Sequence, residues 1–141
     1  MKARLALART YAELRENQKA ADELQEILSV DPANSEAKAQ RGHLALEAGQ
    51  QEAALKWTTQ ALSVDPNNLT AIENFAVLME RQGKPTEARI ALQKLVSSNP
   101  RNPRFHYLLG RLLSKLHQPD EAKAEFELSK QLEAVPVAPS Q

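Results

Sequence analysis

A dipeptide that ends in proline recurs along this chain at intervals of 34 residues. The three copies are Asp31-Pro32, Asp65-Pro66 and Asn99-Pro100. Because a proline ring disfavours the helical conformation at the residue before it, each copy predicts the end of a helix. A fixed period of this length is typical of chains built from stacked helical repeats. We therefore divide the sequence into four segments, 1–34, 35–68, 69–102 and 103–136.

Aligning the four segments brings small residues into two columns. One column holds only alanine, and the other holds alanine or glycine. Two further columns follow the alanine column at helical spacing and predict the buried stripe of a second helix. Small residues at both columns predict that two helices cross closely in every segment. The small columns are Ala20, Ala54, Ala88, Ala122 and Ala8, Gly42, Ala76, Gly110, and the stripe columns are Leu24, Thr58, Leu92, Phe126 and Ile27, Ala61, Leu95, Ser129.

Glycine, proline and asparagine mark where the helices begin and end. Gly49 and Gly83 favour a left-handed stop after the first helix of a segment. Pro85 and Pro119 suit the first turn of the second helix. Asparagine follows each repeated proline by two residues and can cap the next first helix, at Asn34, Asn68 and Asn102. Each segment is therefore expected to hold two helices of about 13 residues, or about 20 Å.

This pattern of small residue, alanine, large apolar residue and terminal proline on a 34-residue period resembles the tetratricopeptide repeat family over residues 1–136. The resemblance implies an all-α fold, a right-handed α-solenoid or superhelix of four helix-turn-helix hairpins and eight helices. Arg41 and Thr58 depart from it, because the family usually has apolar or aromatic residues there. Ankyrin or other helical arrays are the alternative, although no Thr-Pro-Leu-His motif of ankyrin occurs.

The two ends of the array carry different expectations. Ser129 and Lys130 replace apolar residues of the earlier repeats, which predicts a polar cap on repeat four. Residues 133–141 contain two prolines and do not follow the repeat pattern, so we expect them to be mobile. The fourth repeat is taken to end at residue 136, which leaves 137–141 as the tail. Met1 falls on the first column with no capping residue before it, so we expect the C-terminal part of a longer chain, although the polar Thr10 favours a natural start.

Composition excludes several classes of protein. Lys plus Arg number 18 and Asp plus Glu number 18, so no overall charge attracts nucleic acid or an anionic membrane. No apolar run approaches the roughly 20 residues that a membrane-spanning helix needs. The absence of cysteine excludes disulfides and thiolate zinc sites. A chain without cysteine suits the cytoplasm and the periplasm equally. We expect the cytoplasm, or the periplasm if the chain is a piece of an exported protein.

In this family the first helices line a concave groove, so the resemblance implies which side chains face a ligand. Four of them share one face of a single helix because they are spaced by three, four and four residues. Guanidinium groups grip carboxylates, so this basic set predicts binding of an acidic or C-terminal peptide, unless it is an ordinary solvated face. The predicted groove residues are Arg9, Gln40, His43, Asn74, Arg104, Tyr107, Arg111 and Lys115. The last four form the basic set on one helix face.

These observations predict a protein-protein interaction module, an adaptor or assembly scaffold without catalytic activity. Self-association into a homodimer, through an uncovered first helix and Trp57, is the alternative. The family's clamp for chaperone tails is matched only by Asn74 and Arg104. His43 and Glu47 suit a surface pair better than a catalytic one. No cofactor or metal is expected, and RNA binding ranks third because acidic side chains interrupt the basic track.

Overall fold

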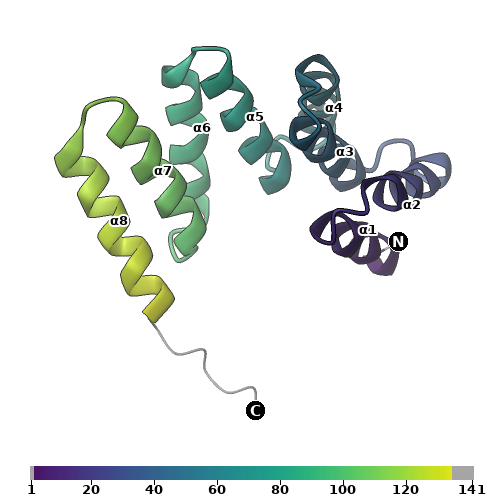
Figure 1. The fold of residues 1–141 in the computed structure, drawn as a ribbon, viewed down its shortest axis with the longest axis horizontal. Coiled ribbons are helices and arrows are strands. Elements are labelled where there is room, and N and C mark those ends of the chain that lie inside the picture. Colours follow the sequence, from purple (N-terminus) through teal and green to yellow (C-terminus); the bar gives the residue numbers. More distant parts are fainter. Residues whose placement is uncertain (1, 135–141) are drawn as a thin grey trace. The chain divides into compact units, whose positions relative to one another are not determined.

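The computed structural model describes residues 2–134, which form eight α-helices and no strand. Figure 1 shows them in chain order. The chain divides into two compact units, Met1–Leu78 and Met79–Gln141, and the boundary falls inside α5. The helices are α1 (Lys2–Glu13), α2 (Asn17–Val30), α3 (Ser35–Glu47), α4 (Gln51–Val64), α5 (Leu69–Arg81), α6 (Pro85–Ser98), α7 (Pro103–Lys115) and α8 (Pro119–Ala134).

The predicted caps and stops are present at the helix ends. Asn34 accepts a hydrogen bond from the Ala37 amide at 2.9 Å, and Asn68 does the same for Ala71. Asn102 accepts from two amides at the start of α7. These side chains satisfy amides that have no partner within their own helices, and so each fixes the residue at which a first helix begins.

The same turn joins the two helices of every repeat. In the second repeat the Gly49 amide donates to the Leu46 carbonyl, and the Gln50 amide donates to the Ala45 carbonyl. Equivalent bonds occur in the other three repeats. The turn needs one residue with positive φ, and glycine supplies it at Gly49 and Gly83. Non-glycine residues take that conformation in the outer repeats, at Arg15 (φ 62°) and His117 (φ 60°).

Exchanging residues at this turn position should shift stability in opposite directions. His117→Gly removes the steric cost of a left-handed side chain and should raise the free energy of unfolding by about 1 kcal/mol. Gly83→Ala introduces that cost and should lower the free energy of unfolding by a similar amount. An added Cβ would meet nothing within 4 Å, so the left-handed backbone is the only source of the loss. Urea denaturation measures both. A destabilised His117→Gly variant would contradict the prediction.

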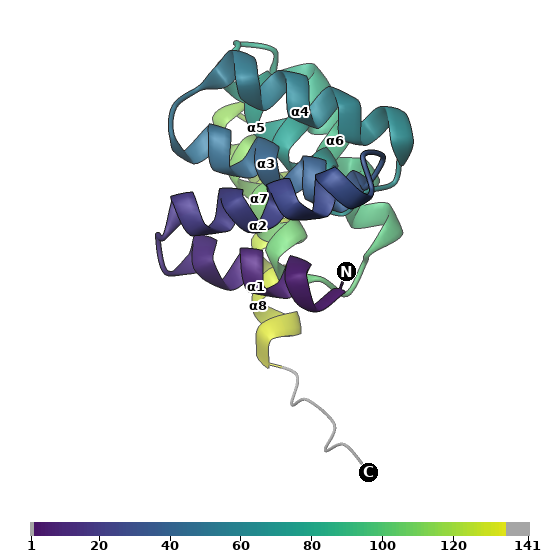
Figure 2. The same ribbon diagram turned by 90° about the vertical axis from the view of Figure 1, so that its right-hand side faces the viewer.

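The first unit is held together by a core that passes from hairpin to hairpin. In the α1–α2 hairpin Ala8, Ala20, Leu24 and Ile27 are at most 1% exposed. Helix α3 adds Ala37 and Leu44 to the same cluster. A second cluster of Ala39, Ala61 and Ala71 joins α3, α4 and α5. Both views show α1 and α2 lying side by side (Figure 1 and Figure 2).

Two residues of the second repeat that depart from the family pattern have different environments. The Arg41 guanidinium lies over the Trp57 ring, 5.1 Å from its centroid, so the charge is accommodated by a cation–π contact. Thr58 is completely buried, and its hydroxyl has no hydrogen-bond partner among the described residues. The polar Thr58 hydroxyl therefore weakens the core of this hairpin.

In the second unit, α7 packs between α6 and α8. The buried face of α7 carries Phe105, Leu109, Leu112 and Leu113. Gly110 lies at the crossing with α8, where a Cβ would come within 2.8 Å of the Phe126 ring. The predicted close approach at this small column is thus present in the last repeat.

The expectation that Ser129 forms part of a polar outer cap is wrong. Ser129 is 5% exposed, and its hydroxyl donates to the Pro103 carbonyl at 2.8 Å, inside the hairpin. Its neighbour Lys130 is exposed, as expected. The helix α8 continues to Ala134, so residues 133 and 134, which were expected in the tail, are helical. The tail at 137–141 lies outside the described residues.

Candidate protein-interaction surface

Four of the predicted groove residues belong to the first unit, and all four contact polar groups of the chain itself. Arg9 and Gln40 both donate to the Glu36 carboxylate, at 3.2 and 3.3 Å. Asn74 is 2% exposed and donates to the Ala39 carbonyl at 2.8 Å, which links α5 to α3. His43 lies on the surface beside Glu47, 3.1 Å away.

Glu36 organises this region, although it is not among the predicted groove residues. Besides Arg9 and Gln40, its carboxylate accepts from Asn68 and Thr70, each at 3.0 Å. These donors come from three successive repeats, so one acidic side chain joins them. Two features of the sequence could have identified Glu36: it lies four residues before Gln40, and it lies 34 residues before Thr70. Because Glu36 already holds Arg9, this part of the surface is less able to bind an anionic ligand.

The other four predicted residues all lie exposed on α7. We call Arg104, Tyr107, Arg111 and Lys115 the α7 basic face. It lies opposite the buried face of the same helix, because the helix alternates the two sets at helical spacing. Pro103 and the Asn102 cap fix where the helix starts and hence the direction of this face.

Tyr107 and Lys115 are held in place by neighbouring side chains. The Tyr107 ring is 49% exposed and lies 5.7 Å from the Phe126 ring, tilted by 49°. This contact with α8 leaves one side of the tyrosine open to a ligand. Lys115 is paired with Glu80, at 2.5 Å. The ion pair reduces the charge that Lys115 offers to a ligand.

His106 lies on α7 but points inward and is 4% exposed. Its Nδ1 lies 2.6 Å from the Glu125 carboxylate, and its Nε2 lies 2.6 Å from the Pro100 carbonyl. Burial lowers the pKa of His106, but the hydrogen bonds to Glu125 and Pro100 and the charge of Glu125 together raise it above its ordinary value. Two acceptors favour the imidazolium, which donates from both nitrogens.

The stability of the protein should therefore fall as the pH rises through the pKa of His106. The raised pKa means that the folded state binds the proton more tightly than the unfolded state. Its contribution to stability is complete below the ordinary pKa of about 6.5 and is lost above the folded-state pKa. Urea denaturation across pH 5 to 9 should show this loss. Glu125→Gln should flatten the profile, whereas the exposed control Glu127→Gln should not; an unchanged profile in His106→Gln would contradict the assignment.

Within residues 2–134, no group of three or more His, Asp or Glu side chains is arranged to hold a metal ion. None of the described helices is long and apolar enough to cross a membrane. The side chains of the α7 basic face can bind a ligand through charge, hydrogen bonds and aromatic contact.

Two sequence families, both described as tetratricopeptide repeat, match the chain. One matches residues 5–68, and the other matches residues 45–112 and 81–133. No curated protein matches the sequence.

Solved structures with the same fold include PilF from Pseudomonas aeruginosa, with a TM-score of 0.81 and 23% identity. That match covers 93% of this chain and 60% of PilF. A MamA fragment from Desulfovibrio magneticus RS-1 has a TM-score of 0.72 at 20% identity, covering 94% of this chain and 75% of that one. Another MamA structure gives 0.73 at 20% identity, with 94% and 77% covered. These similarities establish a helical repeat fold.

Proposed function

Because the chain belongs to the tetratricopeptide repeat family, whose fold generally serves as a non-catalytic protein-interaction scaffold, we propose that the α7 basic face binds an acidic segment of a partner protein. The observation that carries the proposal is the exposure of Arg104, Tyr107 and Arg111 on one face of one helix. Arg104 and Arg111 lie about one helical turn on either side of Tyr107 in sequence, and the Tyr107 ring packs against Phe126 of α8.

The chemistry of these side chains selects the ligand. Each guanidinium can form two parallel hydrogen bonds with a carboxylate, so Asp, Glu or a chain terminus would fit. Tyrosine adds rigid apolar area at little conformational cost, and tyrosine and arginine dominate many binding surfaces. The overall charge of the protein is balanced, so attraction of an acidic ligand depends on this local arrangement.

The first-unit residues of the predicted groove are less exposed than the α7 basic face or are bonded to acidic side chains. The donor groups of Arg9, Gln40 and Asn74 already bond to the chain itself, so a ligand would have to displace those bonds. His43 is placed on the surface with Glu47 and stays a candidate contact. Self-association also stays a prediction, with Leu7 and Leu14 on and beside α1 40% and 64% exposed.

The double variant Arg104→Ala with Arg111→Ala should weaken partner capture by about tenfold or more, because two charge-assisted contacts are lost. The immobilised full chain would be exposed to extract of the source organism, with bound proteins quantified at low and moderate salt. The variant should also lose the salt dependence of capture.

The matched control, Lys2→Ala with Lys56→Ala, removes the same charge from exposed positions elsewhere. Its capture should stay close to that of the unmodified protein. Equal capture by the Arg104 and Arg111 variant at both salt concentrations would rule out the α7 basic face as the binding surface.

A further inference from the structure

The first unit contains a pocket of about 250 Å³ between α2 and the α3–α4 hairpin. Small and apolar side chains make up most of its lining, and the other lining groups are side-chain amides and one arginine. The arginine brings the only formal charge to the lining. We call this the Trp57 pocket, and its lining includes Ala21, Arg41, Leu44, Ala45, Gln50 and Trp57.

Three departures from the repeat pattern meet in the Trp57 pocket. Ala45 is small where the other repeats carry a large side chain, so it leaves space open in the second repeat. Arg41 replaces an apolar residue, and Trp57 replaces glutamate or alanine. The pocket is therefore particular to the second repeat. The corresponding residues are Tyr11, Met79 and Leu113 for Ala45, Leu7, Phe75 and Leu109 for Arg41, and Glu23, Ala91 and Glu125 for Trp57.

The positive charge of the Trp57 pocket has no acidic partner in the described part of the chain. The Arg41 guanidinium lies over the Trp57 ring, and within residues 2–134 its side chain forms no ion pair or hydrogen bond. Contact with a ring face leaves the N–H groups able to donate to a carboxylate. Both side chains are half-buried, so water screens the charge less than at a fully exposed site.

The volume of the Trp57 pocket limits the size of the ligand. An engineered apolar cavity of about 150 Å³ holds benzene. Drug-sized ligands occupy pockets of roughly 300–1,000 Å³. The Trp57 pocket lies between these sizes and so accommodates one ring or branched apolar group together with a carboxylate. The indole of Trp57 offers a flat wall on which an aromatic ring can pack.

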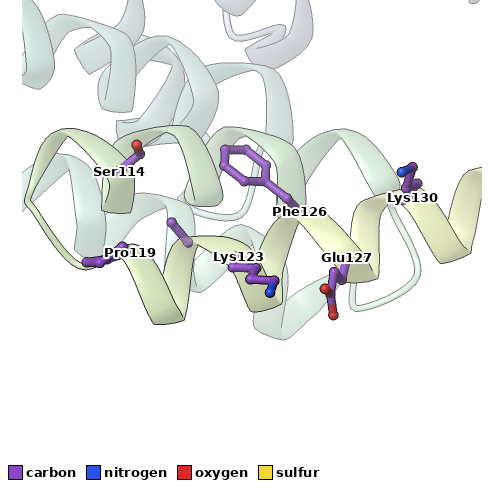
Figure 3. A pocket seen from close by; sticks show the side chains of 7 residues that line it. Ser114, Pro119, Lys123, Phe126, Glu127 and Lys130 are labelled. Atoms are coloured by element: carbon purple, nitrogen blue, oxygen red, sulfur yellow. The ribbon is translucent and has the colours of Figure 1, made fainter.

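A hollow on the α7–α8 hairpin of the second unit lacks this selectivity (Figure 3). Its lining includes Lys123, Glu127 and Lys130, which are exposed and carry charges of both signs. Exposed charges of mixed sign are screened by water and salt and favour no particular ligand charge. The Trp57 pocket instead combines one half-buried cation with an apolar lining.

We propose that the Trp57 pocket binds an apolar carboxylate, in which one aromatic or branched aliphatic group carries one carboxylate. The carboxylate pairs with the Arg41 guanidinium, and the apolar group lies against Trp57 in the space that Ala45 leaves open. A free carboxylic acid and the C-terminal residue of a peptide share this chemistry. The proposal concerns the first unit and does not rest on the function proposed for the α7 basic face, whose residues belong to the second unit.

Trp57 is the single tryptophan of the chain, so its fluorescence reports on this pocket directly. Titration of the full chain with phenylacetate at low salt should give a saturable change in fluorescence. The neutral phenylacetamide should bind about tenfold more weakly, because it loses the charge-assisted hydrogen bonds. Acetyl-glycyl-phenylalanine with a free or an amidated C-terminus makes the same comparison for a peptide. The acid that binds more tightly identifies the source of the ligand.

Two variants and a matched control assign the binding to this pocket. Arg41→Gln should abolish the preference for the acid over the amide. Lys56→Gln removes the same charge from an exposed position of α4 outside the lining and should keep the preference. Ala45→Leu introduces the residue that the fourth repeat has in this column, and it should weaken binding of the acid at least tenfold by filling the pocket. Urea denaturation would verify that each variant is folded.

The proposal is overturned if neither acid gives a saturable fluorescence change, or if acids and amides bind equally. The same preference in Arg41→Gln as in the unmodified protein would also overturn it. Arg104→Ala with Arg111→Ala should bind phenylacetate as the unmodified protein does, so the outcome is independent of the α7 basic face. Loss of phenylacetate binding in that double variant would contradict the assignment to the Trp57 pocket.

Discussion

The structure depends on the close crossing of the two helices within each hairpin. Ala20, Ala54 and Ala122 are at most 3% exposed at this crossing. The partner helix contributes alanine or glycine, and at Gly42 and Gly110 a Cβ would come within 2.8 Å of a side-chain atom of the second helix. Interiors packed this tightly cannot absorb even a methyl group without displacement. The small residues recur every 34 residues because each hairpin repeats this contact.

Close crossing also determines which surfaces are available for binding. A first helix that packs against its partner on one side and a neighbouring hairpin on another keeps only an outer face for ligands. In α7 that face carries two arginines and a tyrosine, while the inner face carries Phe105, Leu109 and other apolar side chains.

The sequence was sufficient to predict the eight helices, the hairpins and the turn positions, because period, caps and stops are local signals. It could not predict the partners of individual polar side chains. Gln40 and Asn74 occupy a column that was predicted to face the groove, yet each is at most 8% exposed. Asn74 donates to the Ala39 carbonyl of α3. Ser129 was interpreted as a surface residue, whereas its hydroxyl reaches the Pro103 carbonyl 26 residues away. Such bonds join residues distant in sequence, and neither period nor composition encodes them.

The close crossing is tested most directly by a double-mutant cycle at Gly42 and Thr58, measured by urea denaturation. An alanine at position 42 would meet the Thr58 hydroxyl at 2.8 Å and the Asn74 amide at 3.1 Å. Gly42→Ala should therefore lower the free energy of unfolding by about 1 to 3 kcal/mol, despite the better helix propensity of alanine. Thr58→Ala in the same chain should recover about 1 kcal/mol of that loss by making room for the new methyl group. A stabilising Gly42→Ala, or additivity of the two changes within about 0.5 kcal/mol, would contradict the account.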